Sequence, residues 1–153
     1  MTPDRQRLTP PIVLPPLVDH IDYQRVVLNA AATGDYFPGH YDPEYARTQG
    51  HPTIFVNTMH LAGFVDRMAT QWAGPRARVV RRKITLLTPI YAGDSMIGGG
   101  HVVAKHRDGP RDLVELHIEV RNQYGELCCP AEVTLDLPRR VGDTMTAVRR
   151  SPV

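Results

Sequence analysis

The feature of this sequence that most restricts its fold is a strict alternation of apolar and polar residues over 114–121, within a strand predicted over 112–121. The even positions of the alternation are apolar and the odd positions are polar, namely Val114, Leu116, Ile118 and Val120 against Glu115, His117 and Glu119. Successive side chains of a β-strand point to opposite faces of its sheet, so this pattern predicts a strand with one buried face. Similar reasoning predicts strands over 78–87, 95–105 and 126–137, separated by turns at 89–93, 108–110 and 124–125. We expect these four strands to form an antiparallel meander. Within the second strand, Gly98-Gly99-Gly100 predicts a bulge or a close backbone approach.

The segment before these strands has the periodicity of a long helix. Between residues 58 and 72, apolar residues recur every three or four positions and fall on one face: Leu61, Phe64, Val65, Met68 and Trp72. Asn57 is a suitable N-cap, and Gly74-Pro75 ends the helix. A shorter helix is expected to begin at Asp42-Pro43-Glu44 and to end by Gly50. A long helix followed by four antiparallel strands predicts an α+β fold in which the sheet packs on the helix.

The two ends of the chain differ in composition from the region between them. Residues 1–18 hold five of the 14 prolines, which predicts an extended or loose arm. Residues 138–153 carry four arginines and few apolar residues, which is typical of a flexible basic tail. We therefore expect one domain over residues 19–137, long enough to bury a core without disulfides.

Composition and charge exclude several classes of protein. The net charge of +2 is too small to indicate nucleic-acid binding, and no run approaches the ~20 apolar residues of a membrane helix. The first ten residues lack the apolar core of a signal peptide, so we expect a cytoplasmic protein. Cys128 and Cys129 are adjacent, and in a strand they point to opposite faces. We expect two reduced core residues, with neither a disulfide nor a zinc site.

One segment combines groups that can move protons. Residues 32–43 place Asp35 and His40 five positions apart, and Pro38-Gly39 bends the chain between them. A carboxylate and an imidazole that face one pocket can share a water molecule, activate it and shuttle its proton. The alternative is an ordinary turn in which Asp35 caps backbone groups, and the spacing by itself favours that alternative.

The same segment resembles the D-x4-H signature of the MaoC-like (R)-specific enoyl-CoA hydratases. The family pattern reads A-x-x-[GS]-D-x-N-P-[IL]-H-x-D-x-x-x-A, and this chain matches it at Ala31, Gly34, Asp35, Pro38, His40, Asp42 and Ala46. A second family feature, a Pro followed by Gly-Asp at the start of a strand, is present as Pro89, Gly93 and Asp94. The resemblance covers residues 21–137 and implies a hot-dog fold, in which an antiparallel sheet wraps around a long central helix.

Within this family the chain looks most like the small subunits of the actinobacterial steroid enoyl-CoA hydratases. The likeness rests on Ile54-Phe55-Val56-Asn57, Gly63, Val65 and Trp72-Ala73-Gly74-Pro75. Those enzymes act in steroid side-chain breakdown and pair two different hot-dog chains. The small subunit supplies the Asp and the His.

The resemblance implies hydration of a trans-2-enoyl-CoA to a (3R)-hydroxyacyl-CoA. Asp35 is expected to take a proton from a water that His40 orients, and one of the two then returns a proton to C2. The family's His-Gly-Met triplet is Asn57-Thr58-Met59 here, and its Asn before the Pro is Phe37. The Thr58 amide is expected to bind the thioester carbonyl, because the first N–H groups of a helix are unpaired.

The remaining expectations concern ligands and partners. Asn57 is expected to contact the substrate, and Arg81, Arg82 and Lys83 are candidates for its phosphates; the alternative for these cations is a solvated strand face. No metal or redox cofactor is expected, since coenzyme A is part of the substrate. A lone hot-dog domain leaves a sheet edge unpaired, so we expect a homodimer or a heteromer with a second MaoC-like chain. A hot-dog thioesterase and a non-catalytic acyl-CoA-binding subunit are the alternative functions.

Overall fold

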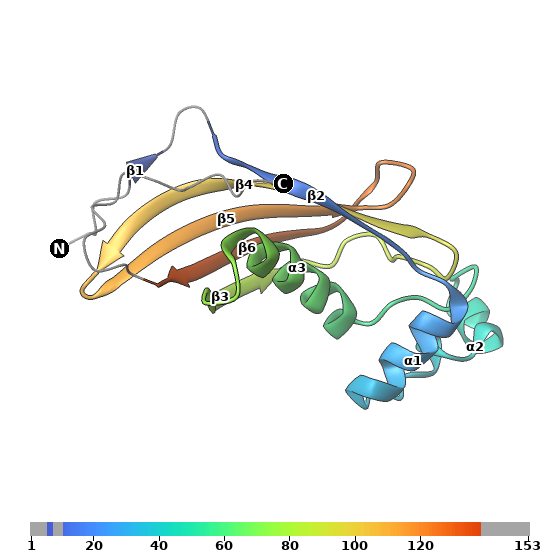
Figure 1. The fold of residues 1–153 in the computed structure, drawn as a ribbon. Helices are drawn as coiled ribbons and strands as arrows, with labels where there is room; N and C mark the ends of the chain where they lie inside the picture. The colour runs from blue at the N-terminus through green and yellow to red at the C-terminus, as the bar shows by residue number, and fades with distance from the viewer. Residues whose placement is uncertain (1–5, 8–10, 139–153) are drawn as a thin grey trace.

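An antiparallel sheet curving over one long helix dominates the computed structural model, which describes residues 6–7 and 11–138 (Figure 1). The helix α3 (Thr58–Ala73) lies under the sheet. Two shorter helices, α1 (Tyr23–Thr33) and α2 (Pro43–Thr48), gather at one end of the molecule. The basic tail expected over residues 138–153 lies outside the described residues, apart from Pro138.

The sheet confirms the predicted strands but changes their order. Its strands follow the order β1 (Gln6–Arg7), β4 (Ser95–Asp108), β5 (Arg111–Arg121), β6 (Leu127–Leu137) and β3 (Arg78–Ile84), all antiparallel, and β2 (Val13–His20) also pairs with β4. The expected meander is therefore correct for β4–β6 and wrong for β3, which lies beyond β6. Periodicity predicts which face of a strand is buried and carries no information about its neighbour, which is why the order was missed.

The prediction of an arm over residues 1–18 placed its boundary inside a strand. β2 runs across residue 18 and pairs with β4, with Val18 opposite Ile97 and His20 opposite Ser95. Its register shifts between Leu14 and Leu17, at the two prolines. Proline cannot donate a ladder hydrogen bond, but an edge strand tolerates it where the register is interrupted.

Helix α1 was also missed by sequence analysis, although both of its ends carry ordinary signals. Asp22 caps it by accepting a hydrogen bond from the Arg25 amide, and Gly34 ends it in the left-handed conformation with φ of 66°. Val26 and Ala30 are its buried residues.

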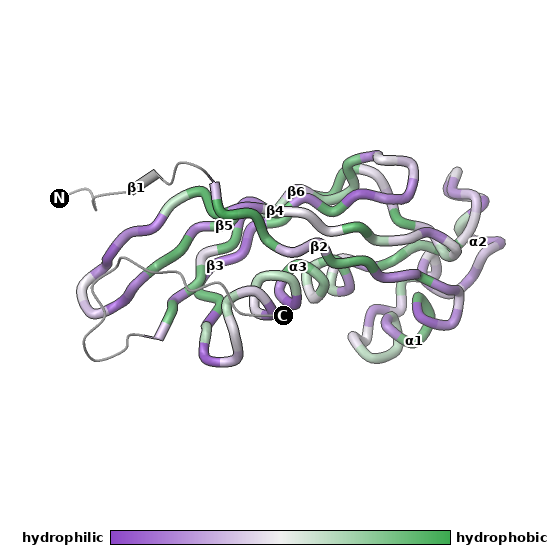
Figure 2. The backbone as a smooth tube through the Cα atoms, turned by 45° about the horizontal axis from the view of Figure 1, so that its top comes forward, coloured by the Kyte–Doolittle hydropathy of each residue, from purple (hydrophilic) through white to green (hydrophobic). Residues whose placement is uncertain are grey.

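The core lies between α3 and the inner face of the sheet, as predicted. Helix residues Leu61, Phe64, Val65 and Met68 are buried, and Trp72 packs beside them. They face buried residues of β4–β6, among them Val102, Leu116, Ile118, Val133 and Leu135. Figure 2 shows α3 lying against the strands, with hydrophobic stretches in both. This arrangement confirms the α+β hot-dog fold.

Two buried cysteines complete the core at the start of β6. Cys128 and Cys129 are both fully buried and free. Burial raises the pKa of the Cys128 thiol to about 11 and also raises that of Cys129. Both therefore remain protonated thiols near neutral pH, as expected for packing residues. Within the described part of the chain, no helix is long and apolar enough to cross a membrane.

The glycine triplet of β4 allows close approach of both α3 and the neighbouring strand β5, as predicted. A Cβ atom at Gly98 would lie 2.8 Å from Phe64 Cε1 and 2.9 Å from Met68 Sδ, so α3 rests on the strand backbone there. A Cβ atom at Gly100 would lie 2.6 Å from the His117 carbonyl oxygen of β5. The register shift of β4 falls later, between Val102 and Ala104.

This contact predicts a difference between two neighbouring substitutions. Gly100→Ala should lower the free energy of unfolding by about 1–3 kcal/mol, because the backbone of β5 has to move to relieve the overlap. Gly99→Ala is the matched control, since its Cβ would meet nothing within 4 Å. Urea unfolding of both variants measures the difference, and equal stabilities would contradict the close approach.

Asn57 holds the start of α3 in place, in agreement with its predicted role as N-cap. Its Oδ1 accepts a hydrogen bond of 2.9 Å from the His60 amide, and its Nδ2 donates one of 2.7 Å to Thr33 Oγ1 at the end of α1. The residue is only 3% exposed. One buried side chain therefore caps α3 and ties it to α1.

The two bonds of Asn57 predict a graded series of stabilities. Asn57→Ala should cost about 1–3 kcal/mol of unfolding free energy, because it removes the cap and leaves buried groups unpaired. Asn57→Ser should cost less, since serine still accepts the bond from the helix amide. Thermal or urea unfolding checks the order; a serine variant as unstable as the alanine variant would argue against capping.

Candidate functional site

The end of α1 places Asp35 at the edge of the helical end of the molecule. Gly34 turns the chain, and the Asp35 amide donates a hydrogen bond of 3.0 Å to the Ala30 carbonyl. The carboxylate Oδ1 accepts a hydrogen bond of 3.4 Å from the Phe37 amide. This bond is the backbone capping that a local turn would give Asp35, the alternative to a catalytic role. The other carboxylate oxygen, Oδ2, faces His40.

His40 is held by a backbone carbonyl. It ends a short 3-10 helix (Pro38–His40), and its Nδ1 lies 2.7 Å from the Phe55 carbonyl oxygen. The Phe55 amide in turn donates a bond of 3.2 Å to the Gly39 carbonyl. A carbonyl oxygen can only accept, so Nδ1 carries the proton and Nε2 of the neutral ring keeps its lone pair.

The structure thus brings Asp35 and His40 together, as their spacing suggested. His40 Nε2 lies 3.4 Å from Asp35 Oδ2. The imidazole is 8% exposed and the carboxylate 36% exposed, so the pair is reached from the Asp35 side. A water that donates one hydrogen to each of these acceptors keeps its oxygen lone pairs free to attack a third atom.

Thr58 is the first residue of α3 and is exposed, so its amide is one of the unpaired N–H groups of the first helical turn. Two ties hold this turn beside the Asp35–His40 pair: the pairing of Phe55 with Gly39 and His40, and the bond from Asn57 to Thr33. The partial positive charge at the start of α3 is therefore directed toward the same end of the molecule. Asn57 itself uses both polar ends of its side chain within the chain, and its expected contact with the substrate stays a prediction.

The turn that contains Gly93 and Asp94 packs against the segment that carries the Phe55 carbonyl. Asp94 Oδ2 accepts a bond of 2.8 Å from the Tyr91 amide and closes the turn at Gly93. Backbone bonds of 3.0 Å from Val56 to Ile90 and 2.9 Å from Ala92 to Ile54 hold this turn against residues 54–56. That segment includes the Phe55 carbonyl, so the turn helps to fix the group that orients His40.

The three basic residues predicted to bind phosphates point in different directions. Arg82 forms an ion pair with Asp66 of α3. Lys83 lies 4.0 Å from Glu132 of β6, and both side chains are largely exposed. Arg81 faces a hollow on the outer side of the sheet. Within the described residues, no hydrogen bond or ion pair joins these cations to the Asp35–His40 pair, so their role in phosphate binding stays a prediction.

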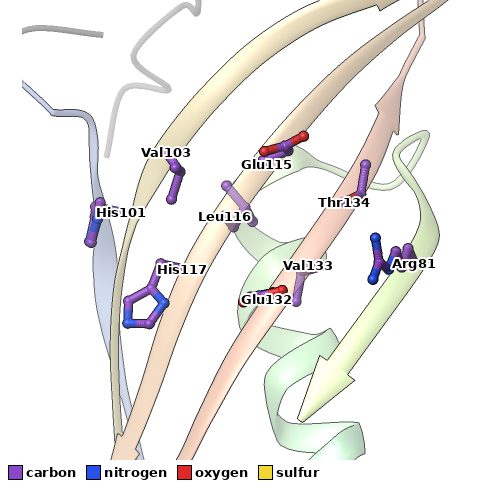
Figure 3. A pocket seen from close by; sticks show the side chains of 9 residues that line it. All are labelled: Arg81, His101, Val103, Glu115, Leu116, His117, Glu132, Val133 and Thr134. Carbon is purple, nitrogen blue, oxygen red and sulfur yellow. The ribbon is translucent and has the colours of Figure 1, made fainter. Parts of the chain in front are cut away.

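The hollow beside Arg81 has a volume of about 410 Å³ (Figure 3). Its polar lining comes from four strands: Arg81, His101, Glu115, His117, Glu132 and Thr134. These positions alternate with core residues such as Leu116 and Val133, so the hollow lies on the face of the sheet opposite α3. It contains neither Asp35 nor His40.

Sequence analysis missed two groups that hold the site together. One is the Phe55 carbonyl, and the other is the Thr33 hydroxyl that receives the Asn57 bond. A backbone carbonyl has no signature in a sequence, because every residue carries one. Thr33 could be recognised only once α1 was known to end beside α3.

Comparison with known proteins places this geometry in a family. The MaoC like domain matches residues 8–122. The chain is 37% identical over 114 residues to the 3-oxo-4,17-pregnadiene-20-carboxyl-CoA hydratase beta subunit of Mycobacterium tuberculosis, covering 74% of this chain and 85% of that protein. It is 27% identical over 110 residues to the (R)-specific enoyl-CoA hydratase of Aeromonas caviae, covering 71% and 81%.

Solved structures agree with these relatives. The ChsH1–ChsH2 complex of M. tuberculosis superposes with a TM-score of 0.77 at 35% identity, over 84% of this chain and 97% of the matched chain. The (R)-hydratase of A. caviae superposes with a TM-score of 0.75 at 25% identity, over 87% and 99%. The predicted family is confirmed: this chain belongs to the MaoC-like domain family of hydratases and dehydratases.

Proposed function

We propose that this chain hydrates trans-2-enoyl-CoA thioesters to (3R)-hydroxyacyl-CoA. The observation that carries the proposal is the pairing of Asp35 Oδ2 with His40 Nε2, 3.4 Å apart, while the Phe55 carbonyl holds Nδ1. The two named relatives, a steroid carboxyl-CoA hydratase subunit and an (R)-specific enoyl-CoA hydratase, support the same reaction. The acyl group is expected to come from steroid side-chain or fatty-acid degradation.

The dyad would bind the attacking water over C3 of the substrate. Asp35 takes a proton as the water oxygen bonds to C3, while His40 orients the water through Nε2. One of the two groups then returns a proton to C2, so that the elements of water are added across the double bond. The two groups share one water, so the base and acid roles are assigned to the pair.

Thr58 would stabilise the negative charge that develops on the thioester oxygen during this addition. Its backbone amide is a donor whatever its side chain, so the change from the family Gly preserves the hydrogen bond. The start of a 16-residue helix adds a favourable partial charge. Arg81, Arg82 and Lys83 stay candidates for the phosphates of coenzyme A.

The dyad predicts loss of hydration in two variants. Asp35→Asn and His40→Gln should each lower kcat by about 100-fold or more, since an amide side chain cannot take or return the proton of the attacking water. Loss of the conjugated enoyl absorbance measures the rate, with a short-chain and a steroid-side-chain substrate. Asp108→Asn and His101→Gln are the same substitutions away from the dyad and should leave kcat unchanged.

Three results would contradict the proposal. Wild-type rates in both dyad variants would remove Asp35 and His40 from the mechanism. Release of free thiol from saturated acyl-CoA would indicate a thioesterase. Binding of enoyl-CoA without turnover, even with a second MaoC-like chain added, would indicate a binding subunit.

We further propose that a different hot-dog chain pairs along β3. Among the described residues, this strand is the edge of the sheet beyond β6, and every residue from 78 to 83 is exposed. Strand β3 carries four basic residues, Arg78, Arg81, Arg82 and Lys83. Two copies of the strand would bring these side chains opposite one another, which is unfavourable, so a chain of different sequence is the favoured partner. The related ChsH1–ChsH2 structure is a complex of two chains.

Charge at this edge should weaken assembly selectively. Val80→Asp should raise the Kd for a second MaoC-like chain by about tenfold or more, because a carboxylate on the edge opposes strand pairing. Val80 is 45% exposed, and Val13→Asp on the opposite edge, where Val13 is 69% exposed, is the matched control. Sedimentation equilibrium measures both. Equal weakening, or none, would argue against pairing along β3.

A further inference from the structure

The residue before Pro38 is an aromatic ring that contacts the histidine of the dyad. Phe37 lies edge-on to His40, with ring centroids 5.4 Å apart and planes at 69°. The ring of Phe55 makes a similar contact with His40, with centroids 5.1 Å apart and planes at 79°. The Phe37 ring is itself held by Tyr45, at 5.6 Å and 86°. His40 therefore touches two rings, and each contact is of the favourable edge-to-face type.

Gly39 makes room for this arrangement. A Cβ atom there would lie 2.6 Å from Phe37 Cε1 and 3.0 Å from Phe55 Cε1, distances at which the rings have to move. The family pattern has Asn at the position of Phe37 and Ile or Leu at the position of Gly39. The two departures are thus spatially coupled, because the ring of Phe37 takes the space next to Gly39 that a side chain there would fill.

Together these contacts restrict His40 on three sides. The Phe55 carbonyl holds Nδ1, and the two rings contact the imidazole, which leaves Nε2 as the atom that meets Asp35. An imidazole without such contacts is free to rotate about its χ2 bond, which exchanges each nitrogen with a ring carbon and turns Nε2 away from Asp35.

We propose that Phe37 and Gly39 form a positioning pair that keeps the lone pair of His40 Nε2 directed at Asp35. Only the kinetic part of this proposal rests on the proposed hydratase function, because the orientation of His40 is a property of the protein without substrate. Phe37 is a positioning residue because it acts through His40.

The test combines a structural and a kinetic measurement. Imidazole nitrogen NMR of the full chain reports which nitrogen of His40 carries the proton, without any substrate. Phe37→Leu and Gly39→Ala should each change the wild-type signal of a ring protonated at Nδ1 toward a mixture of tautomers. Both should lower kcat for enoyl-CoA hydration by about tenfold, with KM changed by less than about twofold, because orientation and not substrate binding is lost.

Two further variants make the test specific. Phe37→Tyr keeps the ring and should retain the wild-type signal and kcat. Tyr36→Leu changes the neighbouring ring, which is 74% exposed, and should also retain both. In the double variant Phe37→Leu/Gly39→Ala, the loss in kcat should equal that of Phe37→Leu alone, since both changes act through one ring.

A Phe37→Leu variant with the wild-type His40 signal would overturn the proposal, and so would losses that multiply in the double variant. If the wild-type chain lacks hydratase activity, the proposed function fails. The NMR comparison then decides the positioning role by itself, so the two failures are distinguishable.

Discussion

The burial of α3 against the inner face of the sheet is the constraint on which the rest of this structure depends. Phe64 and Met68 rest on the backbone of β4 at Gly98, where there is no space for a side chain. This contact fixes the distance between helix and sheet, and with it the place where α3 begins. The first turn of α3, the end of α1 and the segment carrying His40 all take their positions from that point.

The candidate site is assembled largely by backbone groups. The Phe55 carbonyl orients His40, the Thr58 amide belongs to the unpaired first turn of α3, and backbone bonds between residues 54–56 and 90–92 support the segment before that turn. Backbone groups survive side-chain changes, which explains how this chain can differ from its family at Phe37, Gly39 and Thr58 and still bring Asp35 and His40 together. The aromatic contacts of His40 then supply the restraint that these changes required.

The two edges of the sheet are treated differently. One edge of β4 is covered by β1 and β2, and the two prolines of β2 interrupt further pairing. The opposite edge, β3, is exposed over most of its length and carries both valines and basic residues. An edge that offers unpaired backbone groups and apolar side chains is suited to a partner strand, and its positive charge favours a chain of different sequence.

The sequence by itself determined the elements with strong local signals. The periodicity of Leu61, Phe64, Val65 and Met68 and the caps at Asn57 and Gly74 located α3 to within one residue, because helix ends are decided by local hydrogen bonds. Strict alternation likewise located β5, and the spacing of Asp35 and His40, read with the family pattern, predicted that their side chains meet. Only the tertiary structure decided the order of the strands, the pairing of β2 despite its prolines, and the partner of Arg82. Those outcomes depend on which distant segments meet across the sheet, and no local pattern of residues encodes that.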